Sequence, residues 1–369
     1  MAIFKSNQPA AVKKIRTLIV DDSSFVRNIL RSALANHPQI EVVGFAVDGL
    51  DALQKIRVLR PDVITLDVEM PRLNGIGVLE RVVGKAPVSF VMVSSLTQAG
   101  AMITFEALRK GAFDYVTKPS SGSVGNLPAF RQQLLEKIIS AAQAKSYRRH
   151  PCTAPKSSNS SAAPTSPPNR ERGWVVAIGI SCGGPQTLMA MMPAFPSDFV
   201  PILITQHMPA EFTAAFAKHL DNVCNMNVRE ARHGELLSQG TVLVAPGNQH
   251  MKLVRQGGQL RIQLDGGEKV SGHRPSADVM FDSVSRACGR RAIGVIMTGM
   301  GHDGADAITR MRQAGAWTIA QDQETSLVYG MPHEAVKKDG ADHVLPLSKI
   351  PIAISRLLQR GPKPSPVTA

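Results

Sequence analysis

The 369-residue sequence has few cysteines, few aromatic side chains and no long apolar run. Its four cysteines are scattered, without a C-x-x-C pair or zinc-site spacing, which argues against a disulfide framework and predicts reduced thiols. No apolar run reaches the length of a membrane span, and the first residues, MAIFKSNQPAAVKK, lack the apolar region of a secretory signal. We therefore expect a cytoplasmic protein with no membrane insertion.

A nucleic-acid-binding signature is also missing, although the formal net charge is +13. The basic residues are spread along the chain, and their densest cluster is KSYRRH at 145–150. Neither a basic recognition helix nor aromatics interleaved with Arg and Lys is present. We expect no nucleic-acid partner. The charge favours a solvated surface that meets an acidic partner or an anionic membrane face.

The sequence does contain two blocks in which apolar strands alternate with helical segments. Between them, residues 146–172 are dense in Ser and Pro and lack apolar periodicity, which predicts a flexible linker. We therefore predict a first domain at 1–145 and a second at 173–360. Alternating strands and helices predict the α/β class, with two doubly wound parallel-sheet domains.

The expected strands end at positions that can carry chemistry. In the first block they span 16–20, 40–47, 62–66, 88–94 and 113–117. In the second block they span 174–180, 201–206, 241–245, 291–299, 316–321 and 343–347, with a further hairpin strand at 259–266. Ligand sites of such sheets lie beyond the carboxyl ends of the strands. Candidate residues are therefore sought there.

Strand ends of the first block carry Asp21, Asp22, Asp67, Ser94 and Lys118. Three converging carboxylates repel one another, and a hard cation such as Mg²⁺ relieves that repulsion. One carboxylate could then act as a nucleophile toward phosphorus, with the lysine and the hydroxyl facing the phosphoryl oxygens. Taken singly, each Asp could be a helix cap and the Lys-Pro pair a loop. Matching chemistry at four strand ends favours the phosphate site.

This pattern resembles the response-regulator receiver domain over roughly residues 15–140. The resemblance implies a flavodoxin-like fold, a Mg²⁺ cofactor and a chemotaxis-type histidine kinase as phosphodonor. It makes Asp67 the phosphorylation site and Lys118 the invariant lysine, while Ser94 and Tyr115 match the switch positions. The implied metal ligands are Asp21, Asp22, Asp67 and the backbone carbonyl of Glu69.

The second block contains WVVAIGISCGGPQ at 174–186, in which Gly179, Ser181 and Gly183 fit the nucleophile-elbow pattern G-x-S-x-G. His207 follows one expected strand, and Asp303 lies in a glycine-rich turn after another. The order Ser, His, Asp differs from that of the α/β-hydrolases. The residues alone leave alternatives open: the base could be His233, His250 or His273, and Asp303 or Asp306 could cap the following helix.

The second block resembles the catalytic domain of the chemotaxis protein-glutamate methylesterases over residues 174–350. The resemblance lies in the ordered motifs GISCGGP, ITQHMP, APGNQHM, HRPSADVMF, MTGMGHDGA, AGAWTIAQD and GMPHEA. It implies a larger Rossmann-like three-layer hydrolase domain that removes methyl groups from glutamate esters of methyl-accepting chemoreceptors, and in some members deamidates receptor glutamines. It implies Ser181 as nucleophile, His207 as base, Asp303 as the residue that orients the base, and no cofactor at the esterase site.

One position departs from that family pattern. Cys182 follows the nucleophile, where family members often have threonine. A thiol attacks only as thiolate, and nothing cationic adjoins Cys182 in the sequence, so we assign the attack to Ser181. Cys182 and Met300 remain candidates for backbone donors to an oxyanion. The HRPSAD segment has no assigned role at this point.

The order of the two domains predicts regulation. A receiver across the hydrolase cleft would be released when phosphorylation of Asp67 changes the packing around Ser94 and Tyr115. Two rival interpretations are a transcription factor and a scaffold whose hydrolase is inactive. The α/β alternation of residues 174–350 argues against the first, and an assay of methanol release would decide the second.

Overall fold

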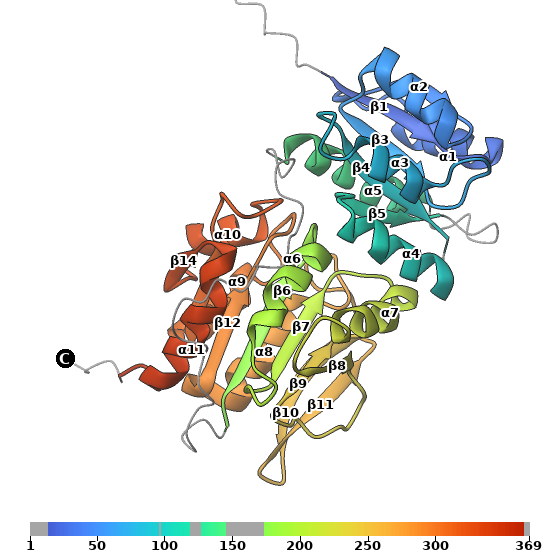
Figure 1. Cartoon of the computed structure of the whole chain (residues 1–369). Coiled ribbons are helices and arrows are strands. Elements are labelled where there is room, and N and C mark those ends of the chain that lie inside the picture. Colours follow the sequence, from blue (N-terminus) through green and yellow to red (C-terminus); the bar gives the residue numbers. More distant parts are fainter. Residues whose placement is uncertain (1–13, 96, 119–126, 145–172, 365–369) are drawn as a thin grey trace, which may run out of the picture.

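The computed structural model describes residues 14–95, 97–118, 127–144 and 173–364. It consists of two α/β domains, the first drawn in blue to teal and the second in green to red (Figure 1). The fold class predicted from the sequence is confirmed. The predicted linker at 146–172 lies outside the described residues.

The first domain is built on a five-stranded sheet in the order β2-β1-β3-β4-β5, and every pair is parallel. This is the flavodoxin-like order. The strands are β1 (Ile15–Val20), β2 (Ile40–Ala46), β3 (Val63–Asp67), β4 (Ser89–Ser94) and β5 (Asp114–Thr117). Strand β3 is buried along its whole length, as its apolar run VITL requires of a central parallel strand.

Helices cover both faces of this sheet. Its helices are α1 (Ser24–Leu34), α2 (Gly49–Leu59), α3 (Gly75–Val82), α4 (Gln98–Arg109) and α5 (Leu127–Gln143). Apolar side chains of α1 and α5 pack in one cluster, whereas those of α2, α3 and α4 pack in another. Side chains cap the helix starts, as at α2, where Asp48 accepts from Leu50 N at 2.8 Å. The sheet therefore lies between two helical layers.

The second domain is built on a seven-stranded parallel sheet in the order β14-β13-β12-β6-β7-β9-β8. Its strands are β6 (Val175–Ile180), β7 (Ile202–Gln206), β8 (Asn227–Glu230), β9 (Thr241–Val244), β12 (Ala292–Ile296), β13 (Trp317–Gln321) and β14 (His343–Leu345). Sequence reasoning missed β8, because its four residues form an edge strand with one buried side chain. The predicted hairpin strand is β11 (Gln259–Asp265), which pairs with β10 (His250–Gln256).

Helices also cover both faces of the second sheet (Figure 1). They are α6 (Gly184–Met191), α7 (Ala210–Asp221), α8 (Ala277–Cys288), α9 (Ala305–Gln313), α10 (Met331–Lys337) and α11 (Ile350–Arg360). The side chains of α6, α7 and α11 pack in one cluster, and those of α8, α9 and α10 in the other. Within the described ranges, no helix has both the length and the apolarity to cross a bilayer.

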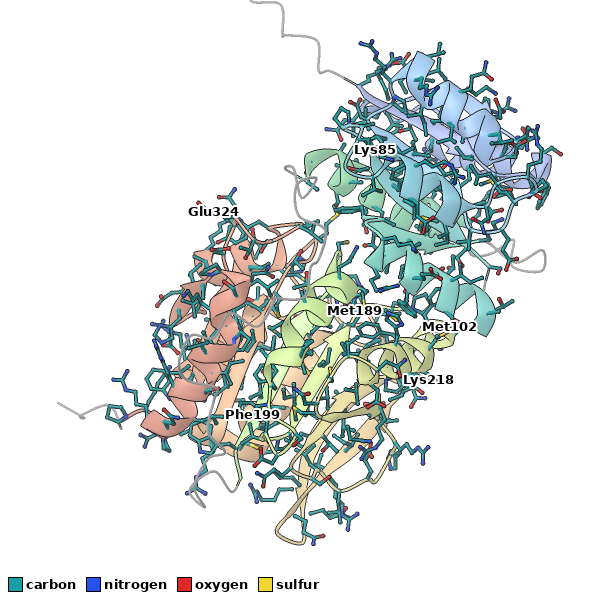
Figure 2. The ribbon with its side chains drawn as sticks, in the orientation of Figure 1. Lys85, Met102, Met189, Phe199, Lys218 and Glu324 are labelled. Carbon is teal, nitrogen blue, oxygen red and sulfur yellow. The ribbon has the colours of Figure 1, made fainter. Side chains whose placement is uncertain are left out.

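The two domains pack against each other through aromatic side chains. Tyr115 of β5 stacks on Phe212 of α7, with ring centroids 4.7 Å apart and planes 13° apart. Phe105 of α4 meets the edge of the same Phe212 ring at 6.1 Å. Figure 2 shows Met102 and Lys218 where these two helices meet. Gln186 of α6 donates to the backbone carbonyls of Ala112 and Phe113 at 2.7 and 2.9 Å.

Candidate active site and receiver pocket

The turn after β6 places Ser181 at the carboxyl end of a central strand. Gly183 has φ +72°, a left-handed conformation that glycine adopts without strain. A Cβ on Gly183 would lie 2.3 Å from Leu327 Cδ1, and one on Gly184 would lie 1.8 Å from Gln206 Oε1. The two glycines therefore allow the chain to turn sharply into α6 directly behind the serine.

Three predicted residues from distant parts of the chain form one hydrogen-bonded chain. His207, which follows β7, lies with Nδ1 3.0 Å from Ser181 Oγ. Its Nε2 lies 2.7 Å from Oδ2 of Asp303, in the turn after β12. Because β7 and β12 flank β6 on opposite sides, this site lies at the switch point of the sheet, where ligand sites of such folds form.

Asp303 is held by the N-terminus of α8 rather than capping its own helix α9. Its carboxylate accepts from the Ser276 hydroxyl at 2.6 Å and from the backbone N–H of Ala277 and Asp278 at 2.7 and 3.2 Å. Burial alone would raise the pKa of Asp303, but the bonds from His207, Ser276 and Ala277 bring it far below its usual range. Asp303 is therefore a stable carboxylate next to the imidazole.

Gln206 and Thr298 fix the backbone on which these residues stand. Gln206 Nε2 donates to the carbonyl oxygens of Ser181 and His207 at 3.0 and 3.1 Å. The Ser181 N–H donates to the Thr298 carbonyl at 3.0 Å, and the Thr298 hydroxyl donates to the Cys182 carbonyl at 2.9 Å. The backbone around the serine is therefore preorganised, as a hydrolytic site requires.

Cys182 is a buried, neutral thiol. Burial, and secondarily the nearby carboxylate of Asp114, raises the pKa of Cys182 to about 12. A thiol that stays protonated at neutral pH is a poor nucleophile. The backbone N–H of Met300 acts on this thiol in the opposite direction and lowers the pKa, but its effect is smaller than that of burial. The N–H proposed from the sequence as an oxyanion donor therefore lies close enough to Cys182 to affect its pKa.

The alternatives left open by the sequence lie in different places. His233 bonds to the Leu264 backbone through Nδ1, and His250 Nε2 donates to the Glu268 carbonyl at 2.8 Å. Asp306 forms an ion pair with Lys338. His273 is the exception, because its ring stacks on the His207 ring.

The acidic pocket of the first domain gathers the predicted carboxylates. Carboxylate oxygens of Asp21, Asp22 and Asp67 lie within 4.8 Å of one another, and Asp22 is exposed. Lys118 Nζ lies 2.8 Å from Asp67 and 3.0 Å from Asp21. Burial raises the pKa of Asp67 to about 6, with the charge of Asp21 adding to the rise and the bond from Lys118 opposing it. The pocket is thus short of positive charge.

The other predicted receiver residues surround this pocket or link it to the second domain. The Ser94 hydroxyl is buried at the end of β4 and donates to the Gly100 carbonyl at 3.2 Å. Glu69 lies two residues after Asp67, with its side chain in solvent. Tyr115 lies in the domain interface described above. A set of three carboxylates has the oxygen chemistry of a magnesium site.

A receiver-type pocket joined to an α/β domain with an alcohol, an imidazole and a carboxylate at its switch point defines a class: response regulators with an enzymatic output domain. Family models agree, because residues 17–124 match "Response regulator receiver domain" and residues 176–354 match "CheB methylesterase".

Full-length relatives narrow this class. A protein-glutamate methylesterase/protein-glutamine glutaminase of Sulfurimonas denitrificans is 43% identical over 93% of this chain and 98% of its own. One from Bordetella avium is 45% identical over 95% of this chain and 98% of its own. The chain belongs to the protein-glutamate methylesterase/protein-glutamine glutaminase family.

Sequence reasoning missed several residues that shape the site. Ser276 and the start of α8 hold Asp303, Gln206 bridges two backbones, and Phe212 contacts the receiver. Ser276 carried a usable signal, since a serine before an apolar helix indicates a helix start. The partner of that helix start lies 27 positions away in the sequence, which no local pattern reveals.

Proposed function

We propose that this protein hydrolyses glutamate γ-methyl esters of methyl-accepting chemoreceptors, deamidates receptor glutamines at the same site, and is activated by phosphorylation of Asp67. The observation that carries the proposal is the chain of contacts Ser181 Oγ, His207 and Asp303 at 3.0 and 2.7 Å. This geometry is that of an activated serine nucleophile with an oriented base.

The mechanism follows from the two ring nitrogens. His207 Nε2–H donates to Asp303, which leaves Nδ1 unprotonated toward Ser181. Nδ1 takes the hydroxyl proton as Oγ attacks the ester carbonyl, and then returns it to the departing methoxide, so that methanol leaves. Water then hydrolyses the acyl-serine by the same proton path. With an amide substrate, ammonia leaves instead of methanol.

The protonated imidazole formed in each step is stabilised by Asp303, which α8 keeps ionised. The oxyanion would be bound by backbone N–H groups of the turns near Cys182 and Met300. Ser181 makes the attack, since Cys182 stays protonated.

Regulation rests on the domain interface. Asp67 and Tyr115 belong to the same receiver sheet, and Tyr115 stacks on Phe212 of the helix that follows His207. On the other side of the site, the Ser140 hydroxyl of α5 donates to Met300 Sδ at 3.6 Å. The receiver therefore packs along the rim of the hydrolase site. Phosphorylation of Asp67 would move Ser94 and Tyr115 and weaken this packing.

The receiver pocket fits Mg²⁺ as the cofactor of phosphorylation. Asp22 and Asp67, with the carbonyl of Glu69, would hold the ion, and Asp21 would orient the set. When bound, the ion supplies positive charge for the incoming phosphoryl oxygens. Lys118 already contacts Asp67 and would pair with the transferred group. The esterase site holds its own proton donors and acceptors, and we propose no cofactor there.

The partners follow from the two activities. A chemotaxis-type histidine kinase would donate the phosphoryl group, and chemoreceptors would supply the ester. The enzyme would act in the cytoplasm on the cytoplasmic part of these receptors, without membrane insertion and without nucleic acid.

Methanol release from methylated receptor membranes, with and without a small phosphodonor such as acetyl phosphate, tests the proposal. The full chain should release methanol, and the phosphodonor should raise the rate. Ser181→Ala should abolish release, whereas Ser355→Ala, whose hydroxyl bonds to a backbone carbonyl within α11, should not. Normal turnover by Ser181→Ala would refute the esterase, and an unchanged rate after removal of residues 1–171 would refute the inhibition.

A further inference from the structure

The HRPSAD segment, residues 273–278, contacts one face of the His207 imidazole and the carboxylate bound to its Nε2. His273 stacks face to face on His207, with ring centroids 3.7 Å apart and planes 7° apart. Ser276 and the first residues of α8 bind the carboxylate that receives His207 Nε2–H. This short segment therefore contacts His207 directly through the His273 ring, and acts on it indirectly by binding Asp303.

A tight turn presents the His273 ring. Val270 and His273 exchange two backbone hydrogen bonds at 2.9 and 3.1 Å, and Ser271 and Gly272 both have positive φ, at 52° and 80°. This is the geometry of a two-residue hairpin turn. The Ser271 hydroxyl donates to Asp278 at 2.9 Å, and Asp278 accepts from Ala307 N at 3.0 Å. The turn is therefore fastened to both α8 and α9.

The stack limits the one motion that the hydrogen bonds leave free. Ser181 and Asp303 bind the two nitrogens of His207, which fixes the line through them. The ring can still pivot about that line, and pivoting would turn the nitrogen lone pair away from the serine. A second ring parallel to the face of His207 blocks this rotation.

The charge of His273 matters as much as its shape. Burial, together with the neighbouring charge of His207, lowers the pKa of His273 to about 4. The other charged or titratable groups around it are Lys269 and His302, which also lower the pKa, and Asp303, which raises it. At neutral pH the ring is uncharged, and the face of an uncharged aromatic ring attracts a cation. His207 becomes such a cation during turnover.

We propose that His273 is a positioning residue of the hydrolase site, which holds the His207 ring in its productive plane and presents an uncharged face to the imidazolium. The inference rests on the function proposed above. His273 touches neither the substrate nor the serine in this account, so its effect should fall on kcat rather than on KM.

Three substitutions in the full chain separate shape from charge, measured as methanol release with saturating phosphodonor. His273→Ala removes the stack and should lower kcat about 10- to 100-fold with KM within about threefold. His273→Phe keeps an uncharged ring and should restore kcat to within about fivefold of the wild type. His273→Arg adds a fixed positive charge, and should lower kcat further than Ala and move the acid limb of the kcat/KM profile to lower pH.

Controls keep the outcomes distinct. His233→Ala, whose imidazole bonds to the Leu264 backbone, should match the wild type. Thermal melts of every variant exclude loss of folding as the cause. If the wild type releases methanol and Ser181→Ala does not, the proposed function holds whatever the His273 variants do. The inference is overturned if Phe is no better than Ala, if the loss falls on KM, or if Arg leaves the acid limb in place.

Discussion

Two buried aspartates, Asp67 at the end of β3 and Asp303 in the turn after β12, have pKa values that are shifted in opposite directions. The pKa of Asp67 in the receiver is raised to about 6, whereas that of Asp303 in the second domain is far below its usual range. Burial raises both. The opposite shifts in pKa come from the hydrogen-bond donors. Asp303 accepts hydrogen bonds from the N-terminus of α8, from a hydroxyl and from an imidazole, whereas Asp67 shares one lysine with Asp21.

This contrast distinguishes the hydrolase site, whose charged groups all have partners within the chain, from the receiver pocket, whose carboxylates are suited to bind a ligand. Asp303 has its full set of partners within the chain, so it can orient His207 without any addition. Asp67 lies in a cluster of three carboxylates with a single lysine, so a cation would balance the remaining negative charge. The hydrolase site around Asp303 is therefore suited to chemistry, and the receiver pocket around Asp67 is suited to switching.

Replacing each aspartate by asparagine should give the largest difference in turnover. Asp303→Asn should lower kcat by about 10³- to 10⁴-fold, because the amide no longer fixes the His207 tautomer. Asp67→Asn should keep the unphosphorylated rate of the wild type. Methanol release from methylated receptor membranes measures both. Comparable losses in the two variants would contradict the division of roles.

The same asparagine at position 67 should stabilise the fold. The pKa of Asp67 is about 6 in the folded chain against 3.8 for the free side chain, so the folded state binds more protons between these values. Stability from this group is therefore present at low pH and lost as pH rises through about 6. Asp67→Asn should be more stable than the wild type at pH 7 by about 1–3 kcal/mol.

Denaturant unfolding at pH 4, 5, 6 and 7 measures this difference. The advantage of Asp67→Asn should grow with pH, and added Mg²⁺ should reduce it by stabilising only the wild type. Removing the metal with a chelator should restore it. A difference that is constant with pH would show that the carboxyl is not perturbed by its neighbours.

The sequence predicted the two sheets and most of the residues of both sites, but not the hydrogen bonds that set the pKa values of Asp67 and Asp303. Both sheets, the clustered carboxylates and the strand ends bearing Ser181, His207 and Asp303 follow from apolar strands and their polar ends. The sequence could not predict that the start of α8 binds Asp303. A serine before an apolar segment indicates where a helix begins, but it does not indicate which distant carboxylate accepts from that helix start. The same limit explains why His273 could not be distinguished from other loop histidines.

The domain interface was beyond sequence reasoning for a related reason. Phe105, Phe212 and Phe216 read as ordinary buried positions of amphipathic helices, and nothing local marks the partner of each ring. Only the assembled domains show that the rings of α4 and α7 face one another.

Weakening the interface between the two domains should reduce the inhibition of the hydrolase site by the receiver. Gln186→Ala removes two hydrogen bonds from the hydrolase domain to the receiver, at Ala112 and Phe113. Because such bonds are worth about 1 kcal/mol each, the loss of both should raise the unphosphorylated rate by up to about 30-fold. The phosphodonor-stimulated rate should change little. Gln132→Ala, whose side chain bonds to Glu136 within α5, serves as the matched control. Equal rates in both variants would place the inhibition elsewhere.

The smallest effect is expected next to the nucleophile. Cys182→Ala should change kcat by less than about threefold, since a thiol with a pKa of about 12 is not the attacking group. Steady-state methanol release measures it. A loss as large as that of Ser181→Ala would reassign the attack to the thiol.

The most direct test of the central claim, that Asp67 switches chemistry performed at Ser181, is methanol release by the wild type and Asp67→Asn with and without phosphodonor. Phosphodonor should accelerate the wild type and leave Asp67→Asn at its unphosphorylated rate. Equal acceleration of both proteins would contradict it.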